Sequence, residues 1–166
     1  MEGGLAGYTG RICEILNKHS VEYLIVGGLA MALHGYYRKS IAPHGTQTEK
    51  PDIDIWFNPA YTNYFRLLDA LEDLGQDVNK FKNEQEPNPK KSFLKYTFNE
   101  FTLDLLPQLK SKLSFQACYK RRRSVSLNRV VIFYIHTDDL ITDKKANARP
   151  KDLADIAYLE RKRLEN

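Results

Sequence analysis

Cysteine, methionine and tryptophan are scarce in this sequence, with two, two and one residues among 166. The two cysteines, Cys13 and Cys118, stand far apart and form no CxxC or Cys/His pattern. This spacing argues against a zinc site and favours two buried thiols. No Ser or Cys nucleophile is accompanied by a recognisable catalytic triad, so acyl transfer is set aside.

Long apolar runs are also absent. No stretch approaches the ~18–20 apolar residues of a membrane-spanning helix, and the N-terminus lacks the apolar core of a signal peptide. We therefore expect a cytoplasmic protein with no membrane partner. The chain also has no internal repeat and no linker rich in Pro, Gly or Ser, which predicts one domain over residues 1–166.

The residues that are present indicate a folded, mildly basic protein. Hydrophobic residues make up 42%, enough for one substantial core, and the formal net charge is +4. A positive surface favours polyanions such as nucleotides or nucleic acid. It does not identify a partner, because many enzymes carry this much charge.

Apolar spacing and turn residues predict that strands and helices share one sheet, which makes the fold class α/β. Helices are expected at 5–20 and 29–34, from Asn58 or Pro59 to Gly75, in a segment capped by Thr137, and from Pro150 to about 163. Loops are expected at 36–51 and 76–91. Strands are expected at 23–26, 53–57, 92–98, 101–106, 124–127 and 130–135.

The segment Asp52-Ile-Asp-Ile55 is the most informative one. Side chains alternate along a strand, so Asp52 and Asp54 face one side while the isoleucines face the core. Two adjacent carboxylates repel each other, and a divalent cation such as Mg²⁺ or Mn²⁺ would neutralise them. Taken alone, the pair is also typical of a solvated strand end.

Asp104 lies in the otherwise apolar strand segment 101–106. An unpaired buried charge is costly, so this carboxylate needs a partner. One interpretation is a salt bridge to a Lys or Arg. The other is a third member of a metal-binding set with Asp52 and Asp54.

The glycine pair Gly27-Gly28 follows a strand and precedes a helix, where a backbone can come close to phosphates. Together, Val26-Gly-Gly28, Asp52-Ile-Asp-Ile55 and Leu103-Asp-Leu105 resemble the nucleotidyltransferase superfamily, including its small bacterial members and the AbiEii-type toxins. Residues 23–36 and 138–160 continue the likeness.

This resemblance implies a mixed central sheet flanked by helices and a two-metal transfer mechanism. Asp52 and Asp54 would hold Mg²⁺ against the triphosphate of a nucleoside triphosphate such as ATP. Gly27 and Gly28 would hold the phosphates, and Asp104 would help to activate an acceptor hydroxyl on a protein, an RNA or a small molecule.

Two cations outside the three-part motif are further nucleotide-binding candidates. Arg38 begins a long polar segment, which includes an insertion at about 40–51 relative to typical relatives, and Lys145 lies in the family-like tail. Both could contact phosphate, although a solvated surface charge explains either residue equally simply.

Two alternatives to catalysis stay open. The first is an inactive protein of the same fold that binds a nucleotide or a partner protein, as in a toxin–antitoxin pair. The second is a nucleic-acid binding module that uses the basic run 120–123.

Overall fold

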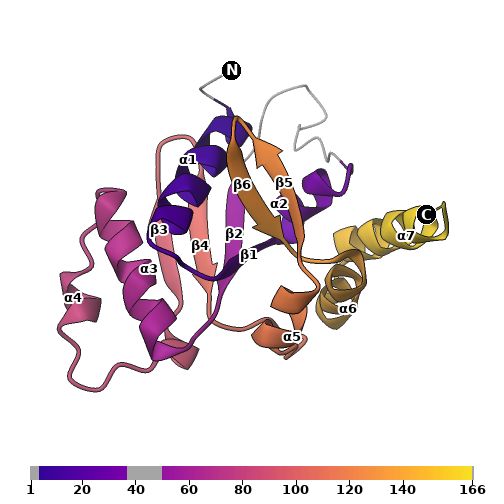
Figure 1. Ribbon diagram of the computed structural model, residues 1–166. Coiled ribbons are helices and arrows are strands. Elements are labelled where there is room, and N and C mark those ends of the chain that lie inside the picture. The colour runs from indigo at the N-terminus through magenta and orange to yellow at the C-terminus, as the bar shows by residue number, and fades with distance from the viewer. Residues whose placement is uncertain (1–3, 37–49, 166) are drawn as a thin grey trace.

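A computed structural model describes residues 4–36 and 50–165 of the chain (Figure 1). Arg38 and residues 40–49 of the insertion lie outside the described residues. One six-stranded sheet has the order β3-β4-β2-β1-β6-β5. Its strands, in chain order, are β1 (Tyr23–Val26), β2 (Asp52–Phe57), β3 (Leu94–Thr97), β4 (Thr102–Leu106), β5 (Arg123–Leu127) and β6 (Val130–Tyr134).

The sheet is mixed. The central strand pair, β1 and β2, is antiparallel, while β2 runs parallel to β4 and β1 runs parallel to β6. Each outer strand closes a hairpin, β3 with β4 and β5 with β6. The predicted α/β class with a mixed central sheet and flanking helices is confirmed.

The central strands form where the sequence is continuously apolar or alternates between apolar and polar residues. Every side chain of β1 is buried, as expected for a central strand covered on both faces. In β2 the alternation is visible: Ile53 and Ile55 are fully buried, whereas Asp52 is exposed and Asp54 partly buried. The sequence prediction that the two acids share one face of the strand is therefore confirmed.

Helices cover both sides of this sheet. Figure 1 shows α1 (Leu5–Lys18) and α3 (Tyr61–Asp73) in front of the strands, with α6 (Thr137–Asn147) and α7 (Pro150–Glu165) packed together near one end. A large part of the core lies between α1, α3 and the sheet, where buried aliphatic and aromatic side chains meet: Ile12, Leu16, Tyr23, Ile53, Ile55, Phe57, Tyr64, Leu67 and Leu71.

Several predicted boundaries differ from the structure. The helix expected from Leu29 begins earlier, as α2 (Gly27–Leu33), since Gly27 can adopt the left-handed φ of +68° that turns the chain out of β1. The segment 76–91 was expected to be loop but contains two single turns, α4 (Asn79–Lys82) and η1 (Pro89–Lys91).

Two further corrections concern the second half of the chain. The short helix α5 (Phe115–Lys120) was not predicted, and Ser114 caps it by accepting a hydrogen bond from the Ala117 N–H. Helix α6 is capped by His136, whose Nδ1 accepts from the Asp138 N–H at 3.1 Å, so Thr137 is the first helical residue and not the cap.

The strands expected at 124–127 and 130–135 are present, and they form a hairpin. Strands β5 and β6 turn at Asn128 and Arg129, whose φ values of 50° and 70° are those of a tight two-residue turn that suits the twist of the strands. The two thiols, Cys13 and Cys118, are free and buried, as expected. Among residues 4–36 and 50–165, no helix combines the length and apolar character that crossing a bilayer requires.

One buried amide joins the loops at one end of the central strand pair. Asn63 at the start of α3 accepts a hydrogen bond from the Glu22 N–H at 2.7 Å. It also donates to the carbonyls of Glu22 and Asn58, at 3.0 and 2.8 Å. Asn63 thus connects the entry of β1 to the exit of β2.

Replacing this amide should destabilise the fold. We expect Asn63→Ala to lower the free energy of unfolding by roughly 1–3 kcal/mol, because the part-buried Glu22 N–H and Asn58 carbonyl lose the side chain that bonds them, while the Glu22 carbonyl keeps the Asn58 N–H. Urea denaturation followed by circular dichroism measures this. The exposed neighbour Thr62→Ala is the control, and an equal effect of both changes would contradict the role assigned to Asn63.

Candidate functional site

The candidate site begins with two carboxylates held side by side on parallel strands. The β2–β4 register places Asp54 opposite Asp104, and Asp52 opposite Thr102. Residues opposite each other in a sheet have side chains on the same face. The structure therefore brings together two of the three acids that the sequence singled out, with the third two residues away on the same strand.

The charge of Asp54 is strongly disfavoured in this position. Burial raises the pKa of the Asp54 carboxyl to about 7, with further increases from the negative charges of Asp104 and Asp52 and from a hydrogen bond with Asp104. The positive charge of Lys144 acts in the opposite direction. Burial and the neighbouring negative charges outweigh it.

Asp104 has an unusual environment for a carboxylate. Its Oδ1 is buried and has no hydrogen-bond partner among the described residues. The Nζ of Lys95, opposite Asp104 on β3, lies 4.0 Å from this oxygen, but that side chain is 58% exposed. The salt bridge that was the alternative for Asp104 is therefore present, at the outer limit of distance and with a solvated cation.

Asp52 is directed differently. Its side chain is exposed and accepts a hydrogen bond from the Thr102 hydroxyl on β4. Within the described part of the chain, no three His, Cys, Asp or Glu side chains form a group that could hold a metal ion. The three-carboxylate ligand set thus stays a prediction, with Asp54 and Asp104 adjacent and Asp52 engaged with Thr102.

The glycine pair lies directly against these acids. Val26 pairs with Asp54 across β1 and β2, so Gly27 follows at the same level of the sheet. A Cβ at Gly27 would overlap Asp54 Oδ2, and the left-handed φ disfavours any other residue. Gly28 is exposed with open space around its Cα, so its backbone is accessible beside the acids.

The α6–α7 hairpin supplies a buried cation near the site. Lys144 is only 3% exposed, and its Nζ lies 2.9 Å from Asp155 Oδ2 and 3.5 Å from Asp152 Oδ1. Both carboxylates are fully buried. Because Lys144 also lowers the pKa of Asp54, it acts electrostatically on the carboxylate pair as well as on its α7 partners.

Arg149 extends this network from the turn between α6 and α7. Its Nε lies 2.7 Å from Asp152 Oδ2, and its backbone N–H donates to the same oxygen at 3.0 Å. Burial alone raises the pKa of Asp152, but the bonds from Arg149 and the charge of Lys144 bring it down to about 2. The hydrogen bond with Asp152 raises the pKa of Arg149, and the negative charge of Asp54 raises it further. The Arg149 guanidinium therefore interacts electrostatically with the carboxylate pair.

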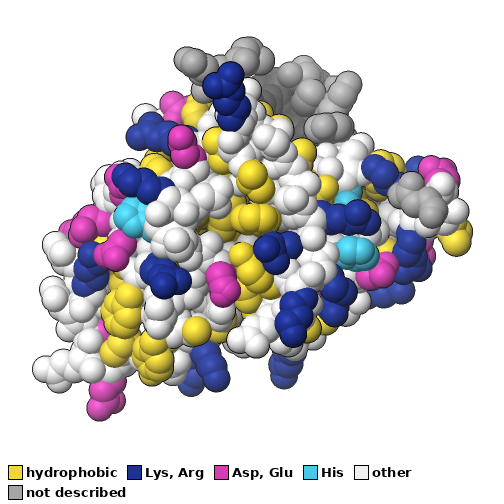
Figure 2. Space-filling model, in the orientation of Figure 1, with side chains coloured by type: hydrophobic (Ala, Val, Ile, Leu, Met, Phe, Trp, Pro, Cys, Tyr) yellow, Lys and Arg dark blue, Asp and Glu magenta, His cyan; other side chains and the backbone are white. Residues whose placement is uncertain are grey.

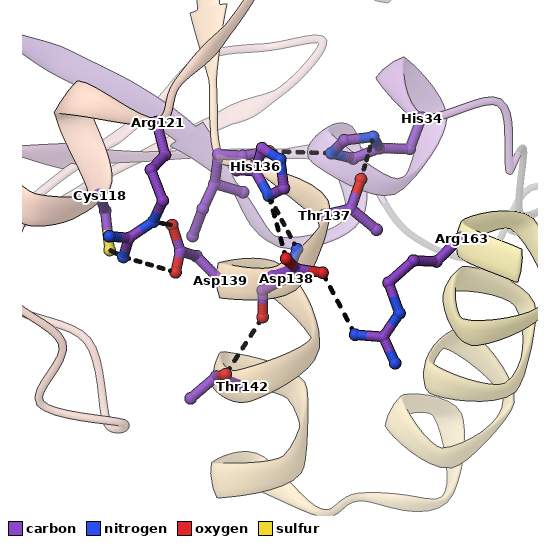
Figure 3. Close-up of polar contacts among 10 residues, drawn as sticks. His34, Cys118, Arg121, His136, Thr137, Asp138, Asp139, Thr142 and Arg163 are labelled. Carbon is purple, nitrogen blue, oxygen red and sulfur yellow. Dashed lines mark hydrogen bonds and ion pairs between the residues drawn. The ribbon is translucent and has the colours of Figure 1, made fainter. Parts of the chain in front are cut away.

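The remaining predicted cations lie elsewhere. The Lys145 side chain is 59% exposed and pairs with Glu160 at 3.2 Å. The basic run is divided: Arg121 makes two bonds to the buried Asp139 (Figure 3), and Arg122 stacks on Tyr119. Arg121 and Arg122 are thus engaged with the fold, while Arg123 opens β5.

The architecture is that of a nucleotidyltransferase-like fold. A solved structure of an antigenic nucleotidyltransferase-like protein from Paracoccidioides brasiliensis superposes with a TM-score of 0.52, covering 93% of this chain and 74% of that one at 13% sequence identity. At this identity the likeness concerns the fold alone. No protein-family model matches the sequence, and no curated protein matches it either.

Sequence reasoning missed two cations near the acids and ranked a third below its neighbour. Lys95 could have been found from the predicted β3–β4 hairpin, because a turn at Asn99 and Glu100 places it opposite Asp104. Lys145 was named as a candidate and its neighbour Lys144 was not, because only the packing of α6 on α7 distinguishes the buried lysine from the exposed one. Nothing local in the sequence marked Arg149.

The two neighbouring lysines allow a matched test. We expect Lys144→Met to lower the free energy of unfolding by about 3–5 kcal/mol, because it removes the ammonium group that lies 2.9 Å from the buried Asp155, whereas Asp152 keeps Arg149. Lys145→Met should change it by less than about 1 kcal/mol, since that pair is solvated. Chemical denaturation of both variants decides this, and similar losses would show that Lys144 is not the buried partner.

The raised pKa of Asp54 predicts a pH-dependent stability. This carboxyl titrates near 3.8 when unfolded and near 7 when folded, so the folded state holds the proton over that range. The free energy of unfolding should therefore fall as the pH rises from 4 through 7 in chelator-treated protein. The Asp54→Asn variant has no carboxyl to ionise at this position, so its free energy of unfolding should not fall in this way. At pH 8 we expect it to be roughly 1–3 kcal/mol higher than that of wild type.

Thermal melting at pH 4 and pH 8 checks this expectation. Glu14→Gln, an exposed acid on α1, is the matched control and should follow wild type at both values. If the curves of Asp54→Asn and wild type run parallel across this range, the carboxylate pair is not the source of the effect.

Proposed function

We propose that this chain is a metal-dependent nucleotidyltransferase that moves a nucleoside monophosphate from a triphosphate to a hydroxyl acceptor. The observation that carries the proposal is the pair Asp54 and Asp104, aligned on parallel strands against the backbone of Gly27. Holding two like charges together is unfavourable, and such a pair in a binding site is better explained by function than by stability.

The residues fit a divalent cation such as Mg²⁺ or Mn²⁺. Asp104 Oδ1 is a buried carboxylate oxygen with no hydrogen-bond partner in the described residues, and burial together with the negative charges of Asp104 and Asp52 raises the pKa of Asp54. Oxygen ligands from carboxylates are those that Mg²⁺ prefers. Asp54 and Asp104 would hold the cation, with Asp52 as a third ligand.

Each neighbouring group has a separate role in this proposal. The exposed backbone at Gly28, which has open space around its Cα, would bind phosphate oxygens through its N–H, and Gly27 would bring this turn close to Asp54. Arg149, half exposed, would contact the triphosphate, while buried Lys144 would act at a distance on the same charges. Arg38 and Lys145 remain further candidates for phosphate contact.

The transfer forms one bond to phosphorus and breaks another. The acceptor oxygen forms a bond to the α-phosphorus, the bond to the bridging oxygen breaks, and pyrophosphate leaves. The proton of the hydroxyl passes to the carboxylate of Asp104. A bound divalent cation would stabilise the negative charge that develops on the phosphoryl oxygens.

The narrower assignment to the AbiEii-type toxins rests on the resemblance of the motif at residues 26–28, 52–55 and 103–105, and the tail 138–160 resembles small members of the superfamily. Within this tail, Lys144, Asp152 and Asp155 meet in one buried cluster. A role beside a partner protein in a toxin–antitoxin system, with a protein or RNA acceptor, is part of the proposal on these grounds.

Calorimetric titration of each nucleoside triphosphate, with and without Mg²⁺, tests the proposal. We expect Mg²⁺-dependent binding by wild type and by Glu14→Gln. Asp52→Asn/Asp54→Asn should bind at least tenfold more weakly, because two metal ligands lose their charge. Asp104→Asn leaves Asp52 and Asp54 to hold the cation on the triphosphate, so it should retain nucleotide binding but slow pyrophosphate release in the presence of RNA or protein acceptors, because the acceptor hydroxyl loses its base.

The outcomes separate the alternatives. Metal-dependent binding without any release of pyrophosphate would favour an inactive protein that binds nucleotide. Triphosphate binding that is indifferent both to Mg²⁺ and to the loss of Asp52 and Asp54 would overturn the metal site. Thermal melting of each variant ensures that a lost signal does not reflect unfolding.

A further inference from the structure

A second cleft lies away from the carboxylates. It has a volume of about 370 Å³ and is bounded by the end of α2, strands β5 and β6, and helices α6 and α7. Gly27, which touches Asp54, begins α2, whereas Leu33 and His34 at its other end line this cleft, ~9 Å further along the helix axis. None of the three acids, Asp52, Asp54 and Asp104, lines it.

The lining of this cleft is predominantly positive. Arg123 comes from β5, and Lys162 and Arg163 come from α7. The one acidic side chain there is Asp138, which lies 3.2 Å from Arg163 and is 56% exposed. Figure 2 shows dark blue and cyan side chains gathered around a magenta one on the side of the molecule where α6 and α7 lie.

Two histidines add hydrogen-bonding groups. His34 Nε2 lies 2.8 Å from the Ile135 carbonyl, so it carries the proton, and Nδ1 faces the Thr137 hydroxyl at 3.5 Å. Lys162 donates to the carbonyl of His34. His136 accepts the Asp138 N–H at Nδ1, which leaves its Nε2 as a donor (Figure 3).

The electrostatics support the same view of this cleft. Burial lowers the pKa of His34, and the positive charges of Lys162, Arg123 and His136 lower it further. The cations from β5 and α7 therefore act together on one place in the cleft. Helix α6 also begins there with Thr137 and Asp138, and its positive dipole end points toward the lining.

We propose that the cleft lined by His34, Arg123, His136, Lys162 and Arg163 binds a phosphate group, separately from the carboxylate site. Two guanidinium groups and an ammonium can neutralise a phosphate, and Arg provides paired N–H donors that match its oxygens. The group could belong to a small phosphate monoester or to a nucleic-acid backbone. The proposal does not depend on transfer chemistry.

Titration with ribose 5-phosphate and with unphosphorylated ribose, followed by NMR of the histidine rings, tests this site directly. We expect only the phosphorylated sugar to shift the His34 and His136 signals. Arg123→Ala/Arg163→Ala should weaken its binding at least tenfold. Arg66→Ala/Arg161→Ala removes the same charge from exposed positions outside the cleft and should weaken it less than twofold.

A second arm uses a short single-stranded RNA and identifies the source of the phosphate. Tighter binding of RNA than of the monoester, lost in Arg123→Ala/Arg163→Ala, assigns the cleft to a nucleic-acid backbone. RNA binding no tighter than the monoester assigns it to a small phosphorylated molecule.

Three results would overturn the proposal: equal binding of ribose and ribose 5-phosphate, equal losses in the two double variants, or binding that disappears in Asp52→Asn/Asp54→Asn. The last result would place the phosphate in the carboxylate site. Because Arg123 and Arg163 are exposed, both variants should fold, and thermal melting verifies this.

Discussion

The repulsion between Asp54 and Asp104 is the constraint around which this fold is arranged. Parallel pairing of β2 with β4 fixes the two acids side by side, and neither strand can slip by one residue without exposing Ile53, Ile55 or Leu103. The burial of these isoleucines and leucines thus fixes the β2–β4 register, and this register places Asp54 beside Asp104. The repulsion between the two acids destabilises the folded state. The burial of apolar side chains on the other face of the same strands stabilises it by more.

Several Lys and Arg side chains of this protein fall into two groups: some pair with buried acids, and others lie near the carboxylates or in the cleft. Lys144 and Arg121 are engaged with buried acids and serve the packing of α7 and α5. Lys95 and Arg149 are half exposed beside the carboxylates, and Arg123, Lys162 and Arg163 line a separate cleft. The mildly basic composition therefore does not describe one uniform patch, and a mutation of any single Lys or Arg has a consequence set by its neighbours.

Much of this could be predicted from the sequence. The strand at 23–26, the Asp face of 52–57 and the hairpin at Asn128 followed from apolar periodicity and turn residues, which are local properties. The helix α5 was missed because one and a half turns carry too little periodicity to recognise. The cap of α6 was placed one residue late because His136 is an uncommon cap, and its role depends on ring orientation.

The parts of the site that could not be predicted are tertiary. Whether Lys144 or Lys145 is buried depends on how α6 packs on α7. The partly satisfied Asp104, and the turning of Asp52 toward Thr102, depend on side-chain geometry across two strands. The cleft at the end of α2 is lined by residues from five elements, so no contiguous sequence pattern could have predicted it.

The central position of β1 has a consequence for the order of events during synthesis. This strand pairs with β2 on one side and with β6 on the other, and β6 is synthesised long after β1 because the strands β2 to β5 lie between them in the chain. Until then, one edge of a fully apolar strand has no neighbour. Such non-local pairing is intrinsically slow, so the nascent chain exposes an aggregation-prone edge that a chaperone is suited to cover.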